Sequence, residues 1–288
     1  MKKKEKMWGL LFIAPLSIGL LMFVLVPLLY SLFVAFSEYD LINPPRFTGG
    51  ENVRRLVEDP YFLKSLRNSF INLLGVPIAM ALSLGAAVLL TKVKRLSNFF
   101  RSVFFLPAIC SSVAVSFMWK YMLDYNYGII NWALERLGLD KILFLSGKMA
   151  MPSMIMMGVW GGMGIIILLY YSALQNVPRV YYEAAMIDGA SAWQQFKRIT
   201  LPAISPITLY ILITQIIGAL QDSTRFMVMS GNGNVEDLTT AGVYVYRQTF
   251  TFGAPGYGST VAWALGLVIM VCTILNFTFS KKWVSYDS

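Results

Sequence analysis

Residues 182–206 read YEAAMIDGASAWQQFKRITLPAISP and form a polar interruption between two long apolar runs. The pattern predicts two short helices joined by a turn. Pro178 suits the first turn of a helix, where a missing N–H leaves no hydrogen bond unmade. We expect helical residues from 181 to 188 and a turn at Gly189, because glycine readily enters the left-handed conformation that closes helices.

The second helix of this segment has its own start and stop signals. Ser191 is a suitable N-cap, and Gln194 three residues later completes the spacing of a capping box. Pro202 and Pro206 are expected to end the helix before the next apolar run, because proline lacks the N–H that a helix interior needs. A polar segment of this kind in an otherwise apolar chain predicts that another molecule docks there.

Apolar residues make up 57% of the 288 residues and charged residues only 14%, about half of the share that is usual in soluble domains. Six apolar runs are long enough to cross roughly 30 Å of hydrocarbon. They lie at residues 10–36, 69–90, 103–122, 151–174, 207–229 and 259–279. These runs lack the period-two alternation of barrel strands, so we expect helices. The fold class predicted is an all-α polytopic membrane protein with six transmembrane helices and no soluble catalytic domain.

The net charge of +9 suits membrane insertion rather than nucleic-acid binding, because it is spread over short loops. Lys and Arg accumulate in cytoplasmic loops, so the lysine-rich N-terminus is expected in the cytoplasm, together with the polar segment and the C-terminus. The inside residues would then include Lys2, Lys3, Lys4, Lys6, Lys92, Lys94, Arg95, Arg101, Arg179, Lys197, Arg198, Lys281 and Lys282.

The first apolar run is expected to be a retained helix rather than a signal peptide. It is too long for a signal-peptide core, and no small-x-small cleavage site follows it. Cys110 and Cys272 both fall inside apolar runs, so we interpret them as core residues and not as a disulfide framework.

The polar segment resembles the EAA loop of permease subunits in binding-protein-dependent ABC importers. The match consists of Glu183-Ala184-Ala185, then Gly189, then Ile199-x-Leu201-Pro202, at the spacing of that motif. The resemblance implies a type I importer permease fold and a bacterial plasma-membrane location. It divides the chain into a tail, first helix and outer loop (1–68), a five-helix core (69–280) with the coupling loop at 175–206, and a short cytoplasmic tail (281–288).

Further landmarks are similar to those of the carbohydrate-uptake branch related to the maltose system. They are Arg101, Leu106-Pro107, Trp119-Lys120, Gly128-x-x-Asn131, Gly138, Gly256-Tyr257-Gly258 and Lys282-Trp283-Val284-x-Tyr286. The stretch Ser230-Gly231-Asn232-Gly233-Asn234 departs from the Thr-x-Gly-Gly-Pro turn of that branch.

The resemblance assigns the EAA segment to contact with a separate ATPase. Glu183 would give a charge-assisted contact to an arginine of that subunit, and Ala184 and Ala185 would let two backbones approach closely. Gly189 would supply the bend, and Asp188 would meet a cation from outside its helix, since the helix dipole disfavours an acid there. Ile199, Leu201 and Pro202 complete the motif. The alternative is a helix lying on the membrane interface, which would be richer in Lys and large apolar residues.

The substrate pathway is expected where polar residues interrupt the fifth run. Gln215 and Asp222 are seven residues apart, hence on one face of a helix, with Gly218 between them leaving room for a ligand. In the resembling family the positions of Gln215, Gly218, Ala219 and Asp222 line the sugar site, as do Gly162 and Ile165 of the fourth helix. Gln221 is included with them as a further polar residue.

Two alternatives remain open for residues near this pathway. Asp222 either lines the site or only pairs with Arg225 three residues later. Trp160, Tyr170 and Tyr171 either stack on a sugar face or are packing aromatics.

Metal and nucleotide sites are not expected in this chain. It has no histidine, and Gly161-Gly162-x-Gly164 lies in an apolar run without the Lys-Ser/Thr of a phosphate loop, so its small residues suit close helix packing. The chain is therefore not expected to be an enzyme or to bind a cofactor; ATP and Mg²⁺ would be bound by the partner ATPase.

The expected partners are a second related permease in a heterodimer, two ATPase subunits, an external binding protein, the sugar and membrane lipid. Alternatives are an ABC permease for a non-sugar solute or an ion-coupled secondary transporter.

Overall fold

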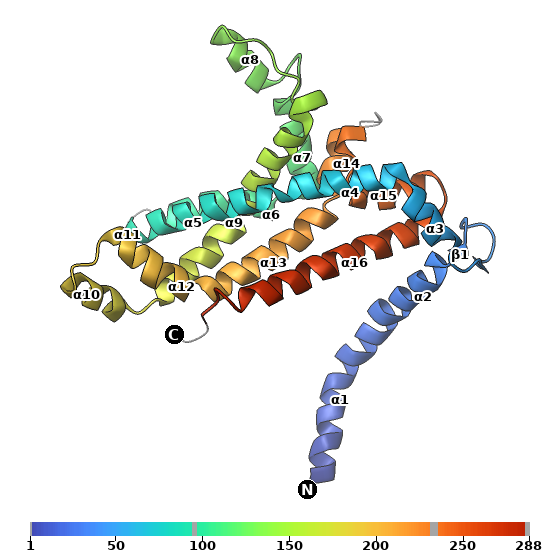
Figure 1. Cartoon of the computed structure of the whole chain (residues 1–288), viewed down its shortest axis with the longest axis horizontal. Helices are drawn as coiled ribbons and strands as arrows, with labels where there is room; N and C mark the ends of the chain where they lie inside the picture. Colours follow the sequence, from blue (N-terminus) through green and yellow to red (C-terminus); the bar gives the residue numbers. More distant parts are fainter. Residues whose placement is uncertain (1, 94–96, 231–235, 286–288) are drawn as a thin grey trace. The chain divides into compact units, whose positions relative to one another are not determined.

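The computed structural model describes residues 2–93, 97–230 and 236–285 (Figure 1). Regular structure in those ranges is almost wholly helical. The one strand pair there is short and antiparallel, with β1 (Ser37–Glu38) against β2 (Arg46–Phe47). The predicted all-α class is therefore confirmed. The predictions made for Lys94, Arg95, residues 231–234 and Tyr286 lie outside the described residues, as does the side chain of Arg101.

Four helical spans are long and apolar enough to cross a membrane: Leu11–Ala35, Pro60–Lys92, Gly147–Asn176 and Pro255–Ser280. Two bent pairs meet the same criteria, namely Ser102–Ile109 with Ser112–Met122 and Ala192–Ala203 with Ser205–Ser230. If each bent pair is one span, the described part of the chain has six spans, as the apolar runs predict.

The third apolar run is not one continuous helix. α6 (Ser97–Ile109) stops two residues after Pro107, and α7 (Ser112–Met122) begins after Ser111, whose ψ of 130° is extended. Pro107 has no N–H to donate inside α6 and weakens its last turn. The two helices bend by 103° at this break, which corrects the expectation of a single helix over 103–122.

The chain forms two compact units, and the first consists of residues 1–62 and 244–266. Thr260 Oγ1 donates to Ala35 O at 2.7 Å, and Trp263 Nε1 donates to Ser31 Oγ at 3.2 Å, so α2 and α16 are tied together. The elements of this unit are α1 (Lys2–Leu20), η1 (Leu21–Leu25), α2 (Val26–Ala35), β1, β2, α3 (Glu51–Glu58), η5 (Arg247–Thr251) and the first part of α16 (Pro255–Ser280).

The second unit, residues 63–243 and 267–288, is built around α9 (Ala150–Asn176). α9 packs against α5 (Gly75–Lys92), α6 and α13 (Ser205–Gln221), and Figure 1 shows α5 and α9 running side by side. The remaining elements are α4 (Pro60–Leu73), α7, α8 (Ile129–Arg136), η2 (Gly147–Met149), α10 (Arg179–Ile187), α11 (Ala192–Gln195), η3 (Phe196–Thr200), α12 (Leu201–Ala203), α14 (Thr224–Ser230), η4 (Glu236–Leu238) and α15 (Ala241–Tyr246). The first residues of α4, up to Phe62, and the last residues of α15, from Tyr244, belong to the first unit. The division of the chain at residues 68 and 280 stays a prediction.

The core of the second unit depends on small residues in α9. Ile166, Ile167 and Tyr170 of this helix are almost fully buried. A Cβ added at Gly164 would overlap the carbonyl oxygen of Phe104, so only glycine lets α6 lie this close to α9. The close packing predicted for the glycine-rich stretch is therefore confirmed at Gly164.

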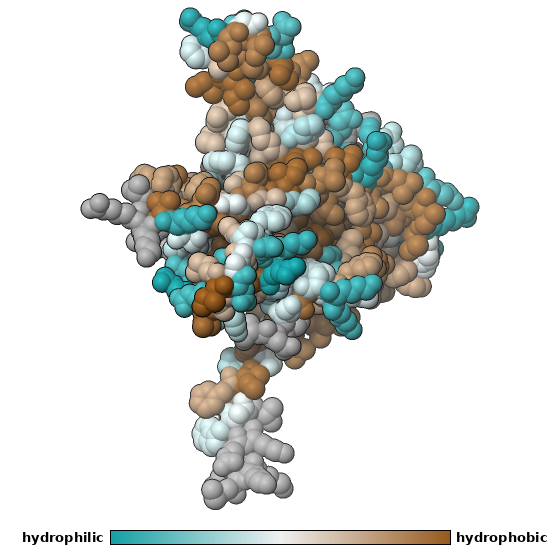
Figure 2. Space-filling view, turned by 60° about the vertical axis from the view of Figure 1, so that its left-hand side comes forward, coloured by the Kyte–Doolittle hydropathy of each residue, from teal (hydrophilic) through white to brown (hydrophobic). Residues whose placement is uncertain are grey.

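Apolar side chains also cover much of the outer surface, as Figure 2 shows in brown. On the first span Phe12 is 84% exposed and Phe23 79% exposed. In water such surface would be costly, whereas hydrocarbon accepts it. This exposure pattern indicates an integral membrane protein.

One amide side chain, that of Asn131, holds together the two ends of the loop between α7 and α9. Asn131, at the start of α8, is 1% exposed. Its Nδ2 donates to Asp124 O at 3.1 Å and to Ile142 O at 3.0 Å, and its Oδ1 accepts from Ile142 N at 2.9 Å. A Cβ at Gly128 would overlap the backbone of Asp124. The Gly128-x-x-Asn131 landmark is thus explained by a tight loop that needs both residues.

Candidate functional site

The predicted coupling loop, 175–206, begins at the end of α9, and its residues from 178 on, called the coupling segment below, fold as two helical pieces joined at Gly189. α10 ends at Ile187, and Gly189 has a φ of +74°. Ala190 N donates to Ala185 O at 2.9 Å and Gly189 N donates to Met186 O at 3.1 Å. These two bonds are those of a Schellman motif, which satisfies the last carbonyl groups of a helix. The predicted turn at Gly189 is confirmed.

The second piece begins with a complete capping box. Gln194 N donates to Ser191 Oγ at 3.3 Å, and Ser191 N donates to Gln194 Oε1 at 2.7 Å. Two N–H groups that a helix start would leave unpaired are satisfied in this way. The predicted N-cap is confirmed.

The prolines of the segment agree with the prediction in part. Pro178 is the residue before α10, with an extended ψ of 130°, rather than a residue of its first turn. Pro202 is helical, but its helix ends one residue later at Ala203, and Pro206 lies in the first turn of α13, so the predicted end of the second helix before the next apolar run is confirmed. The wide turn η3 directly precedes Pro202, with Leu201 N bonded to Phe196 O. A π turn adds a residue to the helix and relieves the clash that a proline ring makes with the preceding turn.

A groove of about 450 Å³ runs between the two pieces of the coupling segment. Tyr182 OH and Thr200 Oγ1 lie 2.9 Å apart and link α10 to η3. Ser285 N donates to Ser205 Oγ at 2.9 Å, which brings the C-terminal stretch to the rim. The groove is lined by Tyr181, Ala184, Ala185, Asp188, Arg198, Ile199, Pro202, Ala203 and Ser285.

Five of the eight predicted coupling residues line this groove: Ala184, Ala185, Asp188, Ile199 and Pro202. Glu183, Gly189 and Leu201 do not. Glu183 is exposed, and Ile187 next to the turn is 87% exposed. The segment therefore presents an acid and bare apolar side chains on its outside, as a docking surface would.

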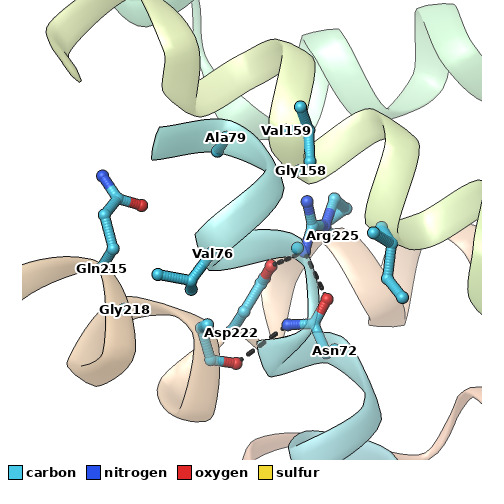
Figure 3. A pocket seen from close by; sticks show the side chains of 12 residues that line it. Asn72, Val76, Ala79, Gly158, Val159, Gln215, Gly218, Asp222 and Arg225 are labelled. Atoms are coloured by element: carbon cyan, nitrogen blue, oxygen red, sulfur yellow. Dashed lines mark hydrogen bonds and ion pairs between the residues drawn. The ribbon is translucent and has the colours of Figure 1, made fainter. Parts of the chain in front are cut away.

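A second hollow, of about 120 Å³, lies between α4, α5, α9 and α13 (Figure 3). Four of the predicted pathway residues line it: Gln215, Gly218, Ala219 and Asp222. A Cβ at Gly218 would meet nothing within 4 Å, so this glycine does leave open space. The other lining residues are Asn72, Gly75, Val76, Ala79, Ile155, Gly158, Val159 and Arg225.

The remaining pathway candidates lie outside this hollow. Ile165 is 49% exposed, and Gln221 is exposed at the end of α13. A Cβ at Gly162 would lie 3.7 Å from Gln215 Oε1, so Gly162 borders the Gln215 side chain. Their role in a pathway stays a prediction.

Asp222 does not continue the helix that carries Gln215. α13 ends at Gln221, and Asp222 has an extended ψ of 108°. Asp222 Oδ2 pairs with Arg225 Nη2 at 2.6 Å, which confirms that the predicted ion pair exists. Because both residues also line the hollow, site lining and pairing are not mutually exclusive here.

Sequence reasoning missed Asn72. Its Oδ1 accepts from Arg225 Nη2 at 3.2 Å, and its Nδ2 donates to Ala219 O at 3.0 Å. The available signal was an amide side chain inside the second apolar run, which hydrocarbon disfavours unless it has a function or a partner.

Two of the aromatic residues considered for sugar stacking are packing residues. Tyr170 is 1% exposed and Tyr171 7% exposed, both in the core around α9. Trp160 is 38% exposed and makes an edge-to-face contact with Trp119 at 5.6 Å between ring centres.

Residues 72–283 match the family model described as "Binding-protein-dependent transport system inner membrane component". The chain belongs to this family. The matched range includes both the hollow and the coupling segment, so the resemblance to ABC importer permeases is confirmed for this inner membrane component.

Several proteins are similar to this chain over nearly its whole length. The probable ABC transporter permease YesP of Bacillus subtilis is 34% identical over 99% of this chain and 94% of its own. The lactose transport system permease LacF of Rhizobium radiobacter is 32% identical over 95% of this chain and 94% of its own. A chain in the crystal structure of a bacterial ABC transporter for the import of the acidic polysaccharide alginate has the same fold, with a TM-score of 0.87, 22% identity and 99% coverage of both chains.

Proposed function

We propose that this inner membrane component is the permease subunit of an ABC importer that moves a sugar or oligosaccharide into the cytoplasm by alternating access. It receives the solute from an external binding protein. It works as a heterodimer with a second, related permease, and two ATPase subunits bind and hydrolyse ATP with Mg²⁺. Both termini and the coupling segment face the cytoplasm.

The residues that line the hollow between α4, α5, α9 and α13 support a sugar as the substrate. It combines two amides, Asn72 and Gln215, and one carboxylate, Asp222, with apolar residues such as Val76 and Ile155. Hydroxyl-rich ligands need hydrogen-bond acceptors and donors beside apolar surface, and pockets of this composition are the usual small-molecule sites. The name of the LacF relative, a lactose transport permease, points in the same direction.

The coupling segment supports the ATPase partner. The Schellman motif at Gly189 and the capping box at Ser191 order the short turn between its two pieces, which suits the transmission of a force from α10 towards α13. Glu183 and Ile187 stand exposed on the outside of this elbow. An exposed acid next to apolar surface suits a complementary cleft in another subunit.

The test is purification of the tagged chain from its native membrane in mild detergent, followed by reconstitution into proteoliposomes. We expect a second permease and an ATPase to co-purify, and sugar uptake to require ATP and the binding protein. Uptake by the isolated chain that is driven by an ion gradient and indifferent to nucleotide would establish the secondary-transporter alternative instead. ATP-dependent uptake of a non-sugar solute alone would refute the substrate class.

A further inference from the structure

Arg225 lies where three segments of the second unit meet. Its Nη2 contacts Asp222 Oδ2 at 2.6 Å, in the break between α13 and α14, and Asn72 Oδ1 at 3.2 Å, on α4. Asn72 in turn donates to Ala219 O near the end of α13. Figure 3 shows this chain of contacts at one end of the hollow, with Gln215 at the other.

The third segment, α9, is shaped to receive the guanidinium. A Cβ at Gly158 would overlap Nη1, Cζ and Nη2 of Arg225. Gly161, one turn further along the same helix, has open space where its Cβ would be. The Arg225 side chain is 15% exposed, and a methyl group at position 158 would displace the guanidinium from its place against α9.

The hollow is too small for a sugar in this state. Small-molecule sites enclose roughly 300–1,000 Å³, whereas this one offers about 120 Å³. Admitting a ligand therefore requires α4, α9 and the α13–α14 break to move apart. These are the three segments that Arg225 joins.

The contacts around Arg225 are incomplete. Its buried Nε has no hydrogen-bond partner among the described residues. Breaking a buried ion pair is costly when one charge is left without a partner. Ligand hydroxyl groups could replace Asn72 and fill the vacant position, so the pair can open without leaving either charge bare.

We propose that Asn72, Asp222 and Arg225 form a latch that holds the hollow contracted, and that Gly158 is the seat of its arginine. A sugar opens the latch by exchanging hydroxyl groups for the Asn72 contact, which couples occupancy to widening. This inference rests on the proposed function, since it assigns to Arg225 a positioning role in alternating access. The latch predicts that these residues control the widening of the hollow and not only its affinity for sugar.

The experiment measures access to the hollow without transport. In a Cys110→Ser, Cys272→Ser background, Gly218→Cys places a thiol in the open space of the hollow. The complex is kept in membrane vesicles of both orientations, and the membrane-impermeant thiol reagent MTSET is applied to each. Gly158→Ala is compared with Gly161→Ala, which changes the same helix by the same methyl group.

We expect Gly158→Ala to raise the labelling rate roughly tenfold on the reactive face, because displacing the Arg225 guanidinium weakens the contacts that hold the hollow contracted. Gly161→Ala should label like the parent. Asp222→Asn keeps the size of the side chain but removes the charge that pairs with Arg225, so it should also label faster than the parent. Size-exclusion profiles identify variants that fail to fold, and these are left out of the comparison.

Equal labelling of the two alanine variants overturns the latch, as does labelling of Asp222→Asn at the rate of the parent. Uptake by the parent complex is measured separately. If uptake is ATP-dependent and the labelling order is absent, the latch fails and the function stands. If the labelling order is found and the complex moves no sugar, the proposed function fails instead.

Discussion

The hydroxyl of Tyr244 donates a 2.5 Å hydrogen bond to Oδ2 of Asp59, 185 residues earlier in the chain. Tyr257 OH donates to the same oxygen, and Asp59 Oδ1 caps the start of α4 by accepting from the amides of Tyr61 and Phe62. One carboxylate therefore joins the first residues of α4, the last residues of α15 and the start of α16, and all the residues bonded to it belong to the first unit.

The charge of Asp59 should make stability depend on pH in the acid range. Burial raises the pKa of its carboxyl, but hydrogen bonds from Tyr244, Tyr257 and two amides outweigh burial and hold the pKa below the ordinary value of 3.8. A depressed pKa stabilises the fold above the unfolded value and loses that effect as pH falls through the folded value. We expect the melting temperature of the parent in detergent to exceed that of Asp59→Asn at neutral pH, and the difference to shrink below about pH 4. Asp140→Asn, at an exposed site, is the control; a gap unchanged at acid pH would contradict the prediction.

Removing the Tyr244 hydroxyl should destabilise the same cluster. Burial and the neighbouring Asp59 raise the pKa of Tyr244 to about 12, so the hydroxyl is a donor at all physiological pH values. A hydrogen bond to a charged group contributes about 1.5–3 kcal/mol, so Tyr244→Phe should lower the melting temperature by roughly 3–10 °C. Tyr246→Phe in the same helix is the matched control, because the Tyr246 ring packs on Phe250 and keeps that contact. Equal melting of the two variants would show that the Tyr244 bond is dispensable.

Gly164→Ala should separate α6 from α9. The added methyl group would overlap the Phe104 carbonyl oxygen, and overpacking of this kind costs about 1–3 kcal/mol. Gly161→Ala, three residues earlier in α9, meets open space and should be neutral or slightly stabilising. Thermal unfolding followed by fluorescence gives the comparison. A stable Gly164→Ala variant would mean that α6 moves freely.

Gly189→Ala should loosen the coupling elbow. Its φ of +74° is unfavourable for residues with a Cβ, at a cost of about 1 kcal/mol. We expect faster limited proteolysis between residues 188 and 191 and weaker coupling of ATP hydrolysis to uptake. Gly85→Ala in α5, where a Cβ meets nothing within 4 Å, is the control. If neither the rate of proteolysis nor the coupling of ATP hydrolysis to uptake changed, the turn at Gly189 would have no role in the mechanism.

Glu183→Ala should leave the chain inserted and folded but weaken ATPase docking or uncouple hydrolysis from transport. Losing one partner of a desolvated ion pair costs roughly 3–5 kcal/mol, whereas an exposed pair contributes about 0–1 kcal/mol. Glu183→Gln separates the charge from the size of the side chain. Pull-down of the ATPase and uptake in proteoliposomes are the measurements. Wild-type assembly together with wild-type uptake in both variants would refute the role.

The coupling segment could be predicted from sequence because its determinants are local. Gly189 and the Ser191–Gln194 pair act on amides and carbonyls a few residues away, so their spacing alone indicates the turn and the cap. The π turn before Pro202 could not be predicted in this way. A proline inside a helix normally ends it, and only the wide turn shows how this helix accommodates one.

The hollow could be predicted only in part. Gln215, Gly218 and Asp222 were found from polarity in one run, although Asp222 lies beyond the end of the helix that the spacing assumed. Asn72 and Gly158 owe their importance to Arg225, and Asn72 is 153 residues away from it in the chain. Such contacts are set by how helices pack, which spacing along the sequence does not encode.

Asn131 bonds to the backbone at both ends of the stretch from Asp124 to Ile142 and so holds these two ends together. Gly138, two residues after the end of α8, is exposed and has a φ of +75°. A protease-cleavable epitope spliced in beside that glycine should leave the helices undisturbed. Comparing digestion of intact cells with digestion of inverted vesicles would then show on which side of the bilayer this loop lies.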